Sequence, residues 1–214
     1  MREERQQDVH ARSYILLPTG SVYAIYLRRG RLCCLFLKGA AKAWILDKLM
    51  QRLRFFMDLS GNKDLLDRYL VAFFASRKTP EDVVPKALRW AEMICQTDKV
   101  VISGFHSPLE KQVLQVLLEH KHPVILALGR SIYKRIPKEY KQPLAEDRML
   151  IVNISNASRQ GWWTSQHRNF TIAHWADECV WAGVHRGSTL DVPCDIYRSK
   201  SQEIDKLSLE DITF

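Results

Sequence analysis

Small and basic residues follow several of the apolar runs in this sequence, and their types suit the binding of phosphate. They fall at Ser76, Arg77 and Lys78, at Ser103 and Gly104 with His106 and Ser107, at Gly129 and Arg130, and at Gly187 and Ser188. Arginine and lysine pair with phosphate oxygens, and small residues that lead into helix N-termini leave backbone N–H groups free to bind them. The pattern predicts a phosphate site, although glycine and serine also serve simply to cap helices.

The other chemistry-bearing residues form no recognisable catalytic set. His106 lies in a turn without a carboxylate or cysteine at a telling spacing, which favours a phosphate contact or a surface residue over acid–base catalysis. Glu110 is explained as the N3 residue of a capping box with Ser107. The sequence has no HExxH, GxSxG or Walker A motif and no metal-ligand cluster. We therefore expect no catalytic residue, no metal and no cofactor.

A strand–helix–strand unit between Val100 and Arg130 positions two of these loops. Val100 to Ile102 is a β-branched, apolar run typical of a buried strand. Ser107 as N-cap and the proline at N1 begin a helix. Pro123 to Leu128 predicts a second buried strand. So short a unit is expected to be a right-handed parallel crossover.

The same alternation extends in both directions. Strands are predicted at Tyr69–Phe74, Lys99–Ile102, Pro123–Leu128, Met149–Val152 and Glu178–Ala182, and helices from Thr79 or from just before Pro85, at Ile136–Ala145 and at Thr164–Trp175, after a polar loop over Asn153–Trp163. Five strands alternating with helices predict an α/β fold with a Rossmann-like, doubly wound, mostly parallel sheet. The loops after the strands should then meet at one edge of that sheet, where ligands bind.

The two ends of the chain differ from this core, which we assign to residues 61–190. Ser13 to Leu37 predicts two or three short strands with a hairpin turn at Arg28–Arg31, and Ala40 to Leu59 has the spacing of an amphipathic helix. That helix is expected to pack on the core, with membrane-surface binding as the alternative. Residues 1–60 are therefore an N-terminal α+β extension. Residues 191–214 carry a weak signal and are expected to be a C-terminal tail.

Charge and cysteine usage suggest the partners and the compartment. A formal charge of +8 and a pI of about 9.3 suggest a polyanionic partner, nucleic acid before anionic membrane. No apolar run is long enough to span a membrane, and the first ten residues lack the pattern of a secretory signal. The five cysteines are an odd number without a CxxC. Cys33, Cys34, Cys95 and Cys179 are expected to be reduced core residues, and Cys194 is placed in a loop where it can be exposed. Together these features predict a cytoplasmic protein.

Four segments, in this order and spacing, resemble the DprA/Smf (DNA-processing protein A) family, and most closely its short stand-alone members. They are AFFASRKTPEDVV, VVISGFHSPLEKQVLQVLL, PVILALGRSI and RNFTIAHWADECVWAG, preceded by the lead-in SGNKDLL. The resemblance covers about Gly61 to Leu190. It implies a Rossmann-like, SLOG-type core. Better-known members of this family bind single-stranded DNA and help to load recombinase during DNA uptake.

The resemblance also implies the roles of individual residues. Ser76 and Arg77 match the family's GSR turn, with Ala75 in place of its glycine, while Ser103 and Gly104 match the SG of its second phosphate loop. Gly129 matches the glycine that ends the third strand, Arg168 and Asn169 match the RN pair that opens the last helix, and Gly187 and Ser188 match the SGS turn. By this resemblance Arg77, Ser103, Gly104, Arg130 and Arg168 would face the phosphate site. Residues 106–110 depart from the family pattern.

The sequence therefore predicts a DprA-like protein that binds single-stranded DNA or nucleotide phosphate, in DNA processing or recombination, without enzymatic activity. The partner is single-stranded DNA or a free nucleotide, and a homo-oligomer is possible. One alternative is a nucleotide sensor. Another is an enzyme like the nucleoside-monophosphate phosphoribohydrolases of this fold class, although their PGGxGT-type loop with a following glutamate is absent.

Overall fold

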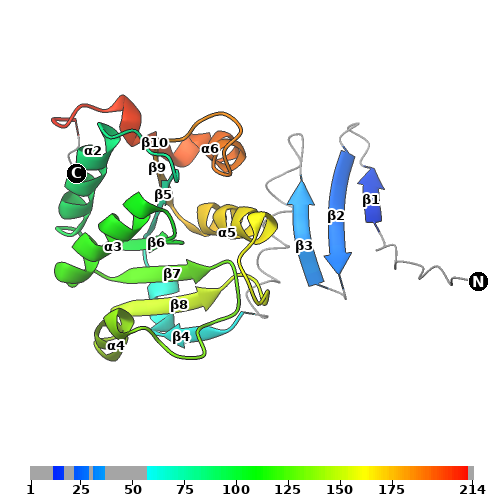
Figure 1. Cartoon of the computed structure of the whole chain (residues 1–214), viewed down its shortest axis with the longest axis horizontal. Coiled ribbons are helices and arrows are strands. Elements are labelled where there is room, and N and C mark those ends of the chain that lie inside the picture. The colour runs from blue at the N-terminus through cyan, green and yellow to red at the C-terminus, as the bar shows by residue number, and fades with distance from the viewer. Residues whose placement is uncertain (1–11, 17–21, 29–30, 37–56, 212–214) are drawn as a thin grey trace, which may run out of the picture. The chain divides into compact units, whose positions relative to one another are not determined.

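The computed structural model describes residues 12–16, 22–28, 31–36 and 57–211, and the chain divides into two units, Met1–Phe56 and Met57–Phe214. In the first unit β1 (Arg12–Leu16), β2 (Val22–Arg28) and β3 (Arg31–Phe36) form an antiparallel sheet in chain order (Figure 1). The centre of the predicted hairpin turn, residues 29–30, and residues 40–56 of the predicted helix lie outside the described residues.

The second unit is built on a seven-stranded sheet in the order β10-β9-β5-β6-β7-β8-β4. The strands are β4 (Leu59–Gly61), β5 (Leu70–Ala75), β6 (Val100–Ser103), β7 (Val124–Leu128), β8 (Met149–Asn153), β9 (Glu178–Ala182) and β10 (Ser201–Glu203). All neighbours pair in parallel except β4, which runs antiparallel to β8. The predicted Rossmann-like α/β fold is confirmed.

Helices cover both faces of this sheet (Figure 1). They are α2 (Val83–Ile94), α3 (Pro108–Glu119), α4 (Lys138–Ala145), α5 (Trp162–Trp175) and α6 (Asp191–Ile196), with 3-10 turns η2 (Lys63–Asp67), η3 (Arg198–Lys200) and η4 (Ile204–Lys206). The chain runs from β5 through β6 and β7 to β8 with α2, α3 and α4 on one face. It then returns through α5, which covers the opposite face, to β9. β9 pairs with the edge of β5 that β6 leaves open.

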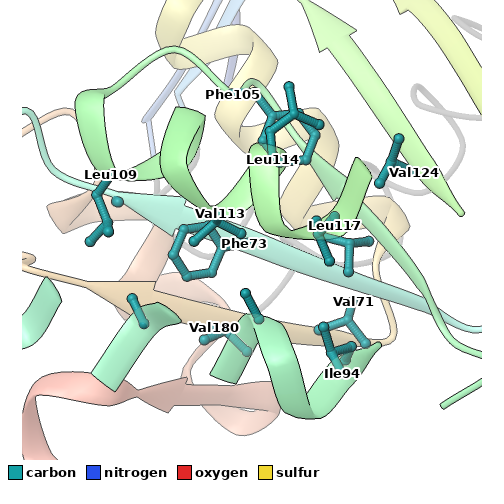
Figure 2. Packing of buried hydrophobic residues seen from close by; sticks show 14 of the residues in the cluster. Val71, Phe73, Ile94, Phe105, Leu109, Val113, Leu114, Leu117, Val124 and Val180 are labelled. Atoms are coloured by element: carbon teal, nitrogen blue, oxygen red, sulfur yellow. The ribbon is translucent and has the colours of Figure 1, made fainter. Parts of the chain in front are cut away.

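The alternation of side chains in β5 explains why helices pack on both faces. Val71 and Phe73 pack with α2 and α3, as Figure 2 shows, and Phe73 stacks on Trp90 with ring centroids 4.9 Å apart. Phe74 lies on the opposite face with α5 and stacks on Trp181 at 4.2 Å. Successive side chains of a strand point to opposite faces, so a strand buried on both faces must be apolar throughout.

The sequence left two alternatives for the start of α2 and predicted the start of α5 two residues too late. α2 begins at Val83, just before Pro85, and not at Thr79. The Thr79 hydroxyl instead donates to the Ser76 carbonyl oxygen at 2.8 Å, so Thr79 closes the turn after β5. α5 begins at Trp162, two residues before the predicted Thr164, because Thr164 Oγ1 accepts from Gly161 N–H at 2.8 Å and organises an earlier first turn.

The edges of the sheet were missed by the sequence analysis. β4 and β10 have three residues each, too few to show a period. Residues 191–206 are therefore not a detached tail, because they form α6 and add β10 to the sheet beside β9. Cys194 lies in α6, not in a loop, and is only 9% exposed, so its expected exposure was wrong. Within the described part of the chain, no helix is long and apolar enough to cross a membrane.

Candidate phosphate and nucleotide site

The loops after β5, β6, β7 and β9 open at the same edge of the sheet. These four strands are neighbours in the order β9-β5-β6-β7 and run in parallel, so their carboxyl ends lie together. The loop after β8 joins them, because β8 is parallel to β7. In open α/β sheets this edge is where ligands bind.

Glu110 ties two of these loops together. It is the N3 residue of α3 and only 3% exposed. One carboxylate oxygen accepts from the backbone N–H groups of His106 at 2.6 Å and Ser107 at 3.0 Å, and the other accepts from Ala75 N–H at 3.1 Å. The capping box with Ser107 is confirmed. The bond to Ala75, the last residue of β5, shows that Glu110 also fixes the first loop against the second.

The turn after β6 has an unusual backbone. Phe105 has φ +43°, a left-handed conformation that is costly for a bulky residue. Ser103 Oγ accepts from Phe105 N–H at 3.1 Å, and the Phe105 ring is buried among the apolar residues of α3, as Figure 2 shows. These contacts hold the turn so that His106 is exposed at the rim. The Ser103 hydroxyl thus stabilises the turn by accepting a hydrogen bond from its backbone.

Arg168, on α5, lies beneath this turn. A Cβ placed on Gly104 would come within 2.4 Å of Arg168 Cζ, so any larger residue here would require the guanidinium to shift. Arg168 is 5% exposed, and its Nε and Nη2 donate to Asn169 Oδ1 at 3.2 and 2.8 Å. Burial lowers the pKa of Arg168, while the carboxylate of Glu110 acts to raise it. Arg168 therefore places positive charge under the second loop.

His106 stands among these charges. Burial and then the positive charges of Arg168 and Arg77 lower the pKa of His106, while the Glu110 carboxylate acts to raise it and Lys111 to lower it further. The electrostatic contacts show that Arg77, which is exposed after β5, lies close enough to act on the same group. A basic cluster of this kind attracts an anion and strengthens its hydrogen bonds.

A pocket of about 470 Å³ opens beside His106. It is lined by Gly104, Phe105, His106, Lys111, Leu126, Leu128, Arg130, Tyr133, Tyr140, Ser158, Arg159 and Gln160. The floor is apolar and the rim carries three cationic side chains. Among the described residues, no carboxylate lines it. Its volume falls in the range of sites that hold one small molecule.

Aromatic rings form one wall of this pocket. The Arg130 guanidinium lies over the Tyr133 ring, with Cζ 4.5 Å from the centroid, and the Tyr133 and Tyr140 rings are 6.1 Å apart. Burial raises the pKa of Tyr140 to about 12, so its hydroxyl keeps its proton at neutral pH and can donate a hydrogen bond. The wall can therefore contact a planar group beside a bound anion.

The other sequence-predicted residues lie at the same edge but outside this pocket. Ser76 Oγ accepts from Lys78 N–H at 3.3 Å and lies 3.4 Å from His185 Nδ1, which links the loops after β5 and β9. A Cβ on Gly129 would approach the Thr164 carbonyl oxygen to 3.0 Å, so this glycine allows α5 to pack closely on β7.

Gly187 and Ser188 belong to the turn that leads into α6. Gly187 has φ +79° and its N–H donates to Asp191 Oδ2 at 2.8 Å. Ser188 Oγ accepts from Leu190 N–H at 3.3 Å. The Gly187 N–H and the Ser188 hydroxyl therefore form hydrogen bonds inside the turn and with the first residue of α6.

Among the pocket residues, the sequence did not single out Lys111, Tyr133, Tyr140, Ser158 or Gln160. A signal existed for the last two, because the polar loop that holds Arg159 follows a predicted strand, as the other candidate loops do. Tyr133 and Tyr140 had no such signal, since their place depends on how the segment between β7 and α4 folds back. Within the described residues, no group of three or more His, Cys, Asp or Glu could hold a metal ion.

No protein-family model matches the chain, and neither does any curated protein sequence. The fold resembles that of DNA processing protein A (DprA) from Streptococcus pneumoniae, with a TM-score of 0.56 and 18% identity over 69% of this chain and 53% of that one. It also resembles DNA processing protein A from Helicobacter pylori, a protein studied for its single-stranded DNA binding mode, with a TM-score of 0.55 and 15% identity over 69% of this chain and 70% of that one. At these identities the similarity establishes the fold. The chain spans about half the length of the Streptococcus pneumoniae protein.

Proposed function

We propose that the unit of residues 57–211 binds single-stranded DNA at the loops after β5, β6, β7 and β8, and that it serves in DNA processing. This proposal rests on the pocket, which combines an apolar floor, a wall of tyrosine rings and a cationic rim. Among the described residues, no carboxylate lines it. Phosphate suits the rim and a nucleobase suits the wall. The fold shared with two DNA processing proteins A adds support.

We assign direct phosphate contacts to the basic side chains that reach this edge. They are Arg77, Lys78, His106, Lys111, Arg130 and Arg159. Gly104 lines the pocket, Ser107 caps α3 through its capping box with Glu110, and Arg168 supplies charge from beneath. In this proposal Ser76, Ser103, Asn169, Gly187 and Ser188 shape the loops through hydrogen bonds to neighbouring protein groups, and Gly129 shapes them by allowing α5 to pack closely on β7.

A free nucleotide is the second candidate ligand, favoured by the volume of the pocket, which suits one nucleotide. The phosphoribohydrolase alternative has less support. Such chemistry needs a carboxylate within reach of the reacting atoms. Both oxygens of Glu110 are engaged by backbone N–H groups of the protein, so this carboxylate is not directed at a ligand.

Titration of a labelled single-stranded oligonucleotide by fluorescence anisotropy tests the proposal. Binding should be tighter to single strand than to duplex and should weaken steeply as salt rises, because phosphate contacts release counterions. Arg77→Ala should weaken binding by about 1.5–3 kcal/mol, the range for a hydrogen bond to a charged group. Arg89→Ala is the matched control, since Arg89 is an equally charged, exposed residue that pairs with Glu92 on α2. Absence of binding at low salt, or equal losses in both variants, would reject the proposal.

A further inference from the structure

Two tryptophans at the start of α5 are exposed. Trp162 is 51% exposed and Trp163 is 53% exposed, among the highest values for large apolar side chains in the described residues. Their rings meet edge to face, with centroids 4.4 Å apart and planes at 87°. In this arrangement each ring keeps at least one face that the other does not cover. Exposed aromatic pairs of this size usually mark an interaction surface.

The backbone of Trp162 is close to the residues that line the pocket. Ser158, Arg159 and Gln160 line the pocket, and Trp162 follows two residues after Gln160. Two residues of chain span at most about 7 Å. The backbone of Trp162 is therefore within about two nucleotide steps of the backbone of Gln160, at the roughly 3.4 Å spacing of a stacked strand. The Gln160 amide donates to Ser165 Oγ on α5 at 3.0 Å, which fixes this segment of rim against the helix that carries Trp162.

We propose that Trp162 is a base-stacking subsite for the nucleotide that follows the one held in the pocket. This inference rests on the proposed function and narrows it, because a subsite outside the pocket makes the ligand a strand and not a free nucleotide. Arg159 and Arg130 supply positive charge at the pocket, and Arg159 lies three residues before Trp162 in the chain. Aromatic rings next to arginine are the combination that binds single strands without sequence preference.

The test compares a ligand that reaches only the pocket with ligands that extend beyond it. The probes are thymidine 5′-monophosphate, an oligothymidylate of twelve nucleotides, and an abasic strand of the same length, which keeps the phosphates and lacks the bases. The variants are Trp162→Ala, Trp162→Phe and, as control, Leu209→Ala, whose side chain is also 51% exposed. All are made in the full chain.

Trp162→Ala should weaken binding of the oligothymidylate about 5-fold to 150-fold, the loss expected for one stacked base. Binding of the monophosphate and of the abasic strand should not change, Trp162→Phe should restore most of the affinity, and Leu209→Ala should match the unaltered protein.

Several results would overturn the inference. If the unaltered protein binds the monophosphate and the oligothymidylate equally, or if Trp162→Ala leaves oligothymidylate binding intact, the subsite is refuted while the pocket proposal stands. A change in sedimentation of Trp162→Ala without a change in oligothymidylate affinity would assign the surface to a protein contact. If the unaltered protein binds none of the three probes, the proposed function fails and the subsite fails with it.

Discussion

Replacing Glu110 with glutamine separates a structural carboxylate from a catalytic one. The Glu110 oxygens accept three backbone N–H bonds, two from the turn before α3 and one from Ala75 at the end of β5. A glutamine has one acceptor oxygen and one NH₂ donor. Whichever way the amide turns, its NH₂ group faces at least one N–H donor. The substitution also removes the negative charge that acts on buried Arg168.

The size of the effect follows from these contacts. A hydrogen bond to a charged group contributes about 1.5–3 kcal/mol, and a buried donor left without a partner costs a similar amount. The best glutamine orientation keeps the bonds to His106 and Ser107 in weaker, neutral form and loses the bond to Ala75. We expect Glu110→Gln to lower the free energy of unfolding by about 2–4 kcal/mol. For a chain of this size that corresponds to roughly 5–15 °C in melting temperature.

Thermal and urea unfolding of the full chain measure this effect. Glu119→Gln is the matched control, because it makes the same substitution at the exposed end of the same helix, where Glu119 accepts only from Gln115 at 2.9 Å. The control should stay within about 0.5 kcal/mol of the unaltered protein. Incubation with AMP, GMP, CMP and UMP, followed by chromatography, tests for release of free base, which we expect to be absent.

Two outcomes would refute this reasoning. If Glu110→Gln were as stable as the Glu119→Gln control, the three backbone contacts would not be holding the loops together. If the unaltered protein released free base and Glu110→Gln did not, at equal folded fraction, Glu110 would be a catalytic residue and the phosphoribohydrolase alternative would replace the binding proposal.

Gly104→Ala should displace the Arg168 guanidinium, because the new methyl group would lie 2.4 Å from Arg168 Cζ. It should lower the free energy of unfolding by about 1.5–3 kcal/mol and weaken oligonucleotide binding, whereas Gly161→Ala, with nothing within 4 Å of the new Cβ, should leave stability unchanged. Burial lowers the pKa of His122 from 6.5 to about 4, so the unfolded chain binds the proton first as the pH falls through this range. Stability should therefore drop by about 2 kcal/mol between pH 7 and pH 5, and urea titrations of His122→Gln should show a flatter profile. A bound anion should raise the lowered pKa of His106, so affinity for an oligonucleotide should increase as the pH falls below 6.5, and His106→Gln should abolish that increase; an identical pH profile in the variant would exclude this role.

Local sequence was sufficient for the elements that carry their own signals. The capping box of Ser107 and Glu110 is formed by residues three apart, so its geometry follows from helix formation alone. The five longer parallel strands were predictable because burial on both faces demands continuous apolar runs. Their alternation with helices was then enough to predict the doubly wound sheet, and with it the edge at which Arg77, His106 and Arg130 emerge.

The short edge strands and the burial of Cys194 could not be predicted from the local sequence pattern. β4 and β10 are held by pairing with β8 and β9, and three residues carry no periodicity of their own. Cys194 is buried because α6 packs on the sheet face that Ile172 also covers. Nothing within a few residues of Cys194 predicts that contact.

The site itself was decided by contacts between residues far apart in the chain. A side chain at Gly104 would force Arg168 to move, because the Arg168 guanidinium, from another helix, fills the space where the Cβ would lie. Glu110 reaches Ala75 across 35 residues, and the tyrosine wall of the pocket forms only when the segment after β7 folds over the sheet edge. Sequence determines which groups are present and which edge they reach, because propensity and burial act locally. Which of those groups stay exposed at this edge and which bond to other groups of the protein is settled by packing, and packing is a property of the folded chain.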